Sequence, residues 1–241
     1  MKAKLTALLG AFAVMLYAMV TPLAAGEGPS GFSIGVIQNS ATFDTTGKEI
    51  EGTGDGETNS TSVTKDVDFP SLFAEYTGGV GGGVTITFGV EIIPGEAELG
   101  NKSRTDTTTN ASETVQDDGT YTAKAEVSNH AAIYIEPGYM FNDYFGIFAK
   151  GGVARATINT LEDLAVGTAA GDSSYEDAEV VAPMVGFGIK AMFPMGIFIK
   201  VERVKIDYQE ITLKSVNGSK INTVIADPEQ DTTRLAIGYN F

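Results

Sequence analysis

The sequence predicts an all-β fold, an eight-stranded antiparallel up-and-down transmembrane β-barrel with four long extracellular loops and three short periplasmic turns. Three observations support this prediction. Apolar and polar residues alternate along eight stretches of the 241-residue chain. The connections between those stretches alternate between long and short. The face opposite the apolar one carries small and charged residues, which suit the interior of a narrow barrel.

The chain starts with the pattern of a secretory signal peptide. Lys2 and Lys4 give a basic start, residues 5–20 are almost entirely apolar, and residues 21–26 are mostly small. We therefore expect residues 1–25 to be cleaved and residues 26–241 to form the barrel domain. The alternative, an uncleaved membrane helix, would need roughly 20 apolar residues. No later stretch is apolar over the length that a membrane helix requires.

Alternation with a period of two identifies the strands. Val84, Ile86 and Phe88 are apolar, and Thr85 and Thr87 lie between them. Five stretches show this pattern clearly, at residues 84–92, 131–139, 145–153, 183–193 and 234–241. Three further stretches show it more weakly, at residues 32–36, 71–76 and 197–202.

The alternation breaks after Val201, where Arg203 and Lys205 take the positions expected for apolar residues. A β-bulge would explain the break, because an extra residue reverses the two faces of a strand. Emergence of the strand from the membrane would explain it equally well.

The connections set the orientation of the predicted barrel. Four of them are long and polar, at residues 45–66, 94–119, 159–178 and 213–231. Three are short, at residues 78–83, 141–143 and 194–196. Long loops outside the cell and tight turns in the periplasm are typical of transmembrane barrels, which also require an even number of strands. The glycines of residues 78–83 form a turn rather than a phosphate loop, because no Lys-Ser/Thr follows them.

The strand face opposite the apolar one distinguishes a membrane barrel from a soluble β-sandwich. In a sandwich the apolar faces pack against each other, whereas in a membrane barrel they face lipid. Charges that face a narrow lumen should pair, so we hypothesise a lumenal charge network. Its predicted members are Glu75, Glu91, Lys124, Glu126, Glu136, Lys150, Lys190, Lys200, Glu202 and Arg234. Aromatic residues near the short turns would form an interfacial girdle, namely Tyr76, Tyr139, Phe141, Tyr144, Phe145, Phe193, Phe198, Tyr239 and Phe241.

Two parts of the sequence resemble a known family. Residues 233–241 end in Phe241, with Tyr239 two positions earlier. This ending resembles the C-terminal signal by which the outer-membrane assembly machinery recognises its barrels. Residues 133–143 and 145–152 resemble strands and a turn of small OmpA/OmpX-like outer-membrane barrels. The resemblance implies a bacterial outer-membrane location, contact with membrane lipid and lipopolysaccharide, and assembly through the C-terminal strand.

Catalysis finds little support in the sequence. His130 is the only histidine, and Ser128 and Glu126 precede it at spacings of two and four residues. Along one strand face each such step spans roughly 6.5–7 Å, too far for the hydrogen bonds of a hydrolytic triad. We predict no enzyme and no catalytic residue, with an envelope lipid acylhydrolase or acyltransferase as the weakest alternative. Neither a zinc motif nor a cofactor motif is present, so none is predicted.

The predicted loops are acidic, with 19 acidic and 6 basic residues in the four long connections. The net charge of the whole chain is −15, which argues against nucleic acid as a partner. Divalent cations that bridge the acidic loops to anionic headgroups remain a hypothesis. We expect a non-enzymatic barrel for envelope structure and surface presentation, or alternatively a narrow channel or carrier for small or hydrophobic solutes. The sequence specifies neither a solute nor an oligomeric state.

Overall fold

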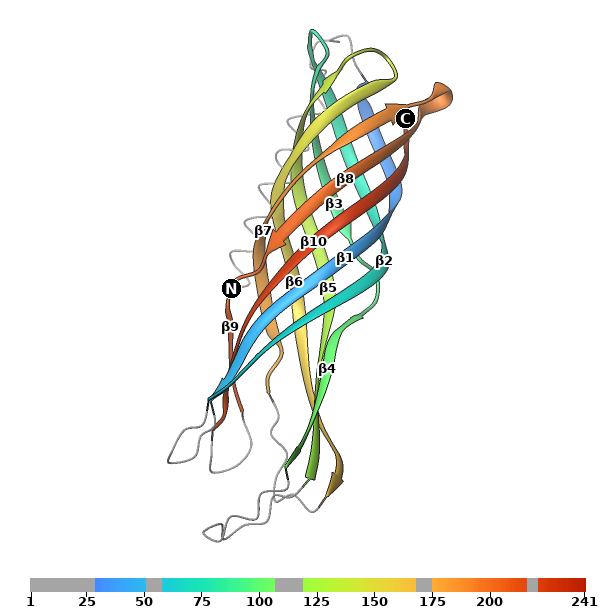
Figure 1. The fold of residues 1–241 in the computed structure, drawn as a ribbon. Coiled ribbons are helices and arrows are strands. Elements are labelled where there is room, and N and C mark those ends of the chain that lie inside the picture. Colours follow the sequence, from blue (N-terminus) through green and yellow to red (C-terminus); the bar gives the residue numbers. More distant parts are fainter. Residues whose placement is uncertain (1–28, 51–57, 107–118, 168–174, 216–220) are drawn as a thin grey trace.

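The computed structural model describes residues 29–50, 58–106, 119–167, 175–215 and 221–241. These residues form one antiparallel sheet that closes on itself, because β1 (Gly31–Ile50) pairs with both β2 (Thr58–Gly81) and β10 (Thr223–Asn240). Figure 1 shows the resulting barrel from the side. The other strands are β3 (Val84–Ile92), β4 (Ala97–Asp106), β5 (Gly119–Met140), β6 (Phe145–Gly167), β7 (Ala178–Met192), β8 (Ile197–Asp207) and β9 (Ile211–Lys214).

The ten strands occupy eight positions around the ring. β3 and β4 follow each other along the same side of β5, and β8 and β9 follow each other along the same side of β10. The first interruption coincides with Pro94, which has no backbone donor, and with Gly95, which has a φ of 94°. The predicted eight-stranded up-and-down topology is therefore confirmed.

The three short turns lie where the sequence predicts them, at the end of the barrel that also holds the C-terminus (upper end of Figure 1). Gly81, Gly82 and Gly83 all have positive φ, which explains the glycine run. In the second turn, the side-chain oxygen of Asn142 accepts hydrogen bonds from two following backbone amides. A short 3₁₀ turn, η1 (Pro194–Gly196), forms the third.

The outward face beside these turns is an apolar belt. Val36, Phe187 and Ile189 are 52%, 66% and 59% exposed, whereas Ile37 and Lys190, which follow two of them in the sequence, are buried. The outward residues of β3 cover nine positions, about the length that crosses a bilayer. The apolar faces thus point away from the interior, as predicted, and a soluble sandwich is excluded. We call this part of the barrel the belt section.

The girdle is largely where it was expected. The predicted girdle residues that are exposed are Tyr139, Phe141, Tyr144, Phe145, Phe193, Tyr239 and Phe241, and Tyr76 is half-buried. Phe198 was wrongly included, because its side chain is fully buried inside the barrel. The inward face of β8 carries it, next to Phe73 of β2.

No helix among the described residues combines the length and the apolar character needed to cross a bilayer. The predicted signal peptide, residues 1–25, lies outside the described part of the chain.

Much of the sequence expected to form long loops is strand instead. Residues 45–50 belong to β1, residues 58–66 to β2, and residues 159–167 to β6. The strands therefore continue past the apolar belt, on the side away from the short turns. We call this continuation the extension. It consists of residues 38–50, 58–70, 97–106, 119–129, 155–167, 178–182, 203–214 and 223–233.

The polarity of the two faces inverts in the extension. On β8, Arg203 and Lys205 point outward, whereas Val204 and Ile206 are buried in the interior. The pairing of β8 with β7 and β10 shows no register shift, so the sequence break at Arg203 is not a bulge. It marks the place where the strand leaves the apolar belt. The interior of the extension is an apolar cluster that includes Phe43, Phe69, Ile158, Val180, Val204, Ile206, Tyr208 and Ile211.

A true bulge lies in β5, where the pairing with β6 shifts between Ser128 and Ala131. Asn129 has a φ of 51° there. Beyond the bulge the faces are exchanged, so Val127 packs against the apolar cluster. Lys124 and Glu126 are consequently partly exposed and pair with each other, and Lys124 also approaches Glu98 of β4. The prediction that these two residues belong to the lumenal network is wrong for this reason.

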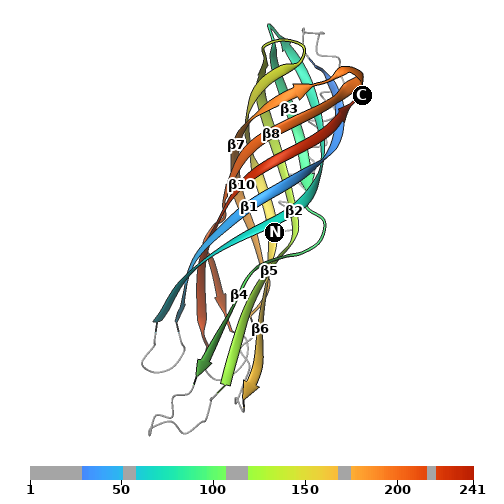
Figure 2. The same ribbon diagram turned by 45° about the vertical axis from the view of Figure 1, so that its right-hand side comes forward.

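The extension separates into two sheets. In one, β1 pairs with β2 and β10 as far as Ile50, and β9 joins at the edge of β10. In the other, β5 pairs with both β4 and β6 as far as Gly119, and β7 pairs with β6. Figures 1 and 2 both show β1 and β2 ending apart from β4, β5 and β6 at the lower end.

Candidate functional site: a charge network across the lumen

Eight buried charged side chains fill the lumen of the belt section. Four are glutamates and four are basic, so the set is electrically balanced. They form one alternating chain in the order Lys190, Glu75, Lys200, Glu136, Lys150, Glu202, Arg234 and Glu91. The structure thus brings together eight of the ten residues predicted for the network. Period-two alternation puts each of these side chains on the inward face of its strand.

Lys200 and Lys150 occupy the centre of this chain. The Nζ atom of Lys200 lies 2.8 Å from Glu75 and 3.2 Å from Glu136. The Nζ atom of Lys150 lies 2.9 Å from Glu136 and 2.6 Å from Glu202. Glu136 therefore bridges the two lysines. Charges taken out of water are costly unless they are paired in this way.

The two ends of the chain are anchored differently. Arg234 forms an ion pair with Glu91, and its Nε atom lies 3.6 Å from Glu202 on the neighbouring strand. At the other end Lys190 lies directly opposite Lys200 across the β7–β8 ladder. Like charges in this position repel each other, and Glu75 offsets the repulsion because it lies 3.8 Å from Lys190 as well.

Uncharged polar groups connect the charge chain to the rest of the wall. Ser71 donates a hydrogen bond of 2.7 Å to Glu91 and accepts one of 3.0 Å from Asn39. Tyr134 donates to Glu75 over 3.2 Å. These three residues are not among the predicted members of the network, although each has the strand parity of the inward face. With Asn39 of β1 included, the network reaches all eight positions of the ring.

Aromatic rings fill the space around the lysines. Lys150 lies 4.3 Å from the ring centre of Tyr134, and Lys190 lies 4.3 Å from that of Phe198. Such cation–π contacts stabilise a desolvated ammonium group. The inward glycines make room for these rings, since a Cβ atom on Gly89 would meet the Tyr134 ring at 2.2 Å. The abundance of small residues on this face thus has a packing reason.

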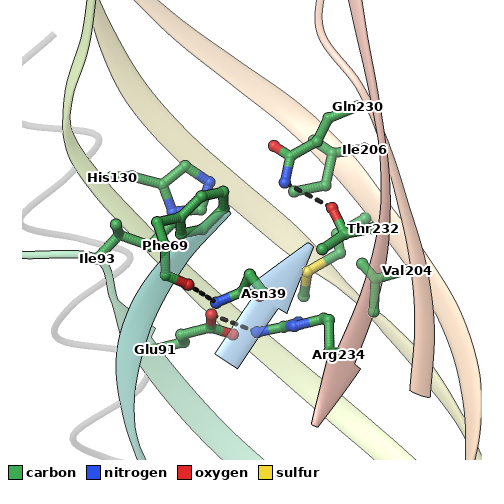
Figure 3. Close-up of a pocket in the computed structure, with 11 residues that line it drawn as sticks. Asn39, Phe69, Glu91, Ile93, His130, Val204, Ile206, Gln230, Thr232 and Arg234 are labelled. Carbon is green, nitrogen blue, oxygen red and sulfur yellow. Dashed lines mark hydrogen bonds and ion pairs between the residues drawn. The ribbon is translucent and has the colours of Figure 1, made fainter. Parts of the chain in front are cut away.

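A cavity of only about 10 Å³ lies between the charge network and the apolar cluster of the extension, enough for at most about one water molecule. Figure 3 shows that Arg234 and Glu91 line one side of it, with Gln230 and Thr232 opposite. The packed aromatic rings and this small cavity leave little free space at this level of the lumen.

His130 lies beside the same cavity (Figure 3). Neither of its ring nitrogens has a hydrogen-bond partner among the described residues. Ser128 instead accepts a hydrogen bond from Asn159, and Glu126 pairs with Lys124. The bulge at Asn129 separates these two residues from His130, so the conceivable triad does not assemble. Within the described ranges, no three His, Asp or Glu side chains are placed to hold a metal ion.

Tyr239 and Phe241 are the residues of the predicted assembly signal. Tyr239 lies on the outward face of β10, and Phe241 directly follows this strand, next to the short turns. They are 45% and 68% exposed, and their ring centres are 5.0 Å apart. Recognition by the assembly machinery remains a prediction.

The geometry of a closed barrel with an outward apolar belt defines an integral membrane protein of the outer-membrane type. Comparison with family models agrees, because the model of the outer membrane protein beta-barrel domain matches residues 5–241. The chain therefore belongs to this family of bacterial outer-membrane barrels. No curated protein matched the chain.

Comparison with solved structures finds similarity to outer-membrane proteins at low sequence identity. The outer membrane protease OmpT from Escherichia coli is 8% identical, with a TM-score of 0.50, over 91% of this chain and 99% of OmpT. OprG from Pseudomonas aeruginosa is 12% identical, with a TM-score of 0.37, over 90% of this chain and 100% of OprG. Ail from Yersinia pestis is 8% identical, with a TM-score of 0.32, over 85% of this chain and 98% of Ail.

Proposed function

We propose that this protein is a closed, non-conducting and non-enzymatic barrel that contributes to envelope structure and presents its extension at the cell surface. The observation that carries the proposal is the balanced chain of eight charges across the lumen. Ions that pass would have to break several buried pairs, each of which is costly to separate. The cavity between the charge chain and the apolar cluster of the extension has room for at most about one water molecule.

The extension is suited to presentation because it has a packed core of its own. Its outer face is hydrophilic, with ion pairs such as Arg203–Asp231 and Lys205–Glu229 between neighbouring strands. Its inner face is the apolar cluster around Phe43 and Ile206. Burial of such residues holds surface segments in fixed positions. Acidic loops at the end of this support would be the part of the protein that contacts cations, lipopolysaccharide or other cells.

Planar-bilayer recordings test the closed lumen. Purified full-length protein refolded into lipid should show no conductance steps across pH and voltage, while an open porin in the same bilayers does. A reproducible unitary conductance would overturn the closed-barrel proposal.

Cysteine labelling on intact cells tests surface presentation, because the natural chain contains no cysteine. Ser62→Cys lies in the extension and Asp143→Cys lies in a short turn, and both positions are exposed. A membrane-impermeant maleimide should label only the Ser62→Cys variant on intact cells and both variants after lysis. Labelling of Asp143→Cys alone on intact cells would reverse the proposed orientation.

A carrier for hydrophobic solutes is the second candidate, favoured by the apolar cluster inside the extension. It differs from the first in requiring this cluster to open. Uptake of an apolar solute into cells that produce the protein, lost after the extension is cross-linked, would favour the carrier over the presentation role.

A further inference from the structure

The wall of the extension has a window between β7 and β9. The ladder between β7 and β8 ends at the pair Met184–Ile206. Further along, within the described part of the chain, the backbones of the two sides pair again only at the isolated bridge Tyr175–Ser215. A pocket of about 590 Å³ lies between them. This volume is within the range of about 300–1,000 Å³ that is typical of small-molecule sites.

The pocket passes through the wall instead of lying on one face of it. Val180 and Ile211, which line it, are 5% and 8% exposed and belong to the apolar interior cluster. Their neighbours Glu179 and Thr212 line it too, and both are exposed. Since successive residues of a strand point to opposite faces, residues of both faces can line one pocket only along an unpaired strand edge.

The floor and the rim of this window differ in chemistry. Val180, Ile211 and the partly buried Leu213 make the floor apolar. Glu176, Asp177 and Glu210 give the rim an acidic character, against a single base, Lys214. Glu179 adds no free charge because it is paired with Arg155. An apolar floor beneath a net negative rim is complementary to a ligand that carries a positive charge on an apolar body.

We propose that the window between β7 and β9 binds a small amphiphilic cation, an ammonium group attached to an alkyl or aryl body. The apolar body would lie against Val180 and Ile211, and the ammonium group would lie between Glu176 and Glu210. This site is separate from the lumenal charge network. It goes beyond the proposed presentation role and does not depend on whether the lumen conducts.

The test uses the full-length protein in nanodiscs of zwitterionic lipid, with 4-phenylbutylammonium as the probe and empty nanodiscs as the blank. Binding is followed by ligand-observed saturation-transfer NMR. The probe 4-phenylbutyrate has a similar apolar body and the opposite charge, so it should bind at least about tenfold more weakly, a difference of about 1.4 kcal/mol.

Paired variants locate the site. Glu176→Gln with Glu210→Gln removes two rim charges at exposed positions and should weaken ammonium binding about tenfold or more. Asp44→Asn with Asp66→Asn removes two charges from exposed positions on β1 and β2 and should leave binding unchanged. Heat-dependent gel mobility confirms that both double variants form the folded barrel.

Several results would overturn the proposal. They are no binding of the ammonium probe, equal binding of the two probes, and equal weakening by the two double variants. A fourth is binding of a basic extended peptide without binding of the ammonium probe, which would assign the open strand edges to a protein partner instead.

Discussion

The belt section and the extension are built from the same strands, yet their two faces have opposite chemistry. On β8, Val201 faces outward in the belt and Glu202 faces the lumen; four residues later Lys205 faces outward and Ile206 faces inward. The register does not change between them. The period of two determines which residues share a face. Whether the outward residues are apolar or polar depends on whether that part of the barrel faces lipid or water. Charge in one interior and apolar packing in the other therefore make two independently testable cores.

The largest effect should come from breaking the charged interior. Lys200→Met leaves Glu75 and Glu136 without their shared cation and should destabilise the folded barrel by about 3–5 kcal/mol. The difference in gel mobility between unheated and boiled samples, followed against temperature, measures the change. The matched control is Lys205→Met on the outward face of the same strand, which should cost at most about 1 kcal/mol because its pair with Glu229 is exposed. Equal losses in the two variants would contradict a buried network.

A defect in the apolar interior should destabilise the extension and leave the belt section folded. Phe43→Ala removes a ring that is 5% exposed within the cluster of the extension. We expect about 3–5 kcal/mol of lost local stability, seen as faster amide hydrogen exchange in the extension while the belt strands stay protected. Thr46→Ala, at an exposed position on the same strand, is the control. Equal acceleration of exchange in the belt strands would show that the two cores are not independent.

The bulge in β5 lies at the boundary between the belt section and the extension, and it determines which residues of this strand face the apolar interior. Two substitutions of Asn129 test whether the bulge is needed there. Asn129→Val places a β-branched residue at a φ of 51° and should cost about 1–2 kcal/mol. Asn129→Gly should cost little, since glycine adopts this conformation readily. Urea-dependent refolding into vesicles measures both changes. If the valine variant is as stable as the glycine variant, the bulge is not needed at this position.

The smallest effect concerns Tyr208, whose hydroxyl group donates a hydrogen bond of 2.9 Å to Gln230 inside the extension. Tyr208→Phe should cost about 1 kcal/mol. Burial also raises the pKa of Tyr208 above its ordinary value. The stabilisation by the neutral hydroxyl is thus fully present below the ordinary tyrosine pKa of about 10 and is lost as the pH rises through the raised value.

Hydrogen exchange in the extension at rising alkaline pH, corrected for the intrinsic exchange rate, checks this dependence. The natural protein should lose stability relative to Tyr208→Phe above about pH 10. A stability difference that does not change with pH would mean that Tyr208 ionises as an exposed tyrosine does.

The sequence by itself determined the barrel, its eight strand positions, its three short turns and the inward placement of most lumenal charges. These features depend on local rules: a period of two along each strand and turn residues such as the glycines 81–83. The missed lumenal partners, Asn39, Ser71 and Tyr134, had the right parity, but nothing local distinguishes a polar residue that joins a network from one that fills space.

Only the tertiary structure decided where the belt ends and what lies beyond it. The extension looks like loop in the sequence because its outward positions are polar and several of its inward positions, such as Thr45, Gly47 and Glu49 on β1, are not apolar either. The bulge at Asn129 removed Lys124 and Glu126 from the lumen, and the unpaired edges of β7 and β9 opened the window. Both depend on how far and in what register each strand pairs with its neighbours in the ring. A strand's own residues show its two faces, but its neighbours determine its register and the places where pairing stops.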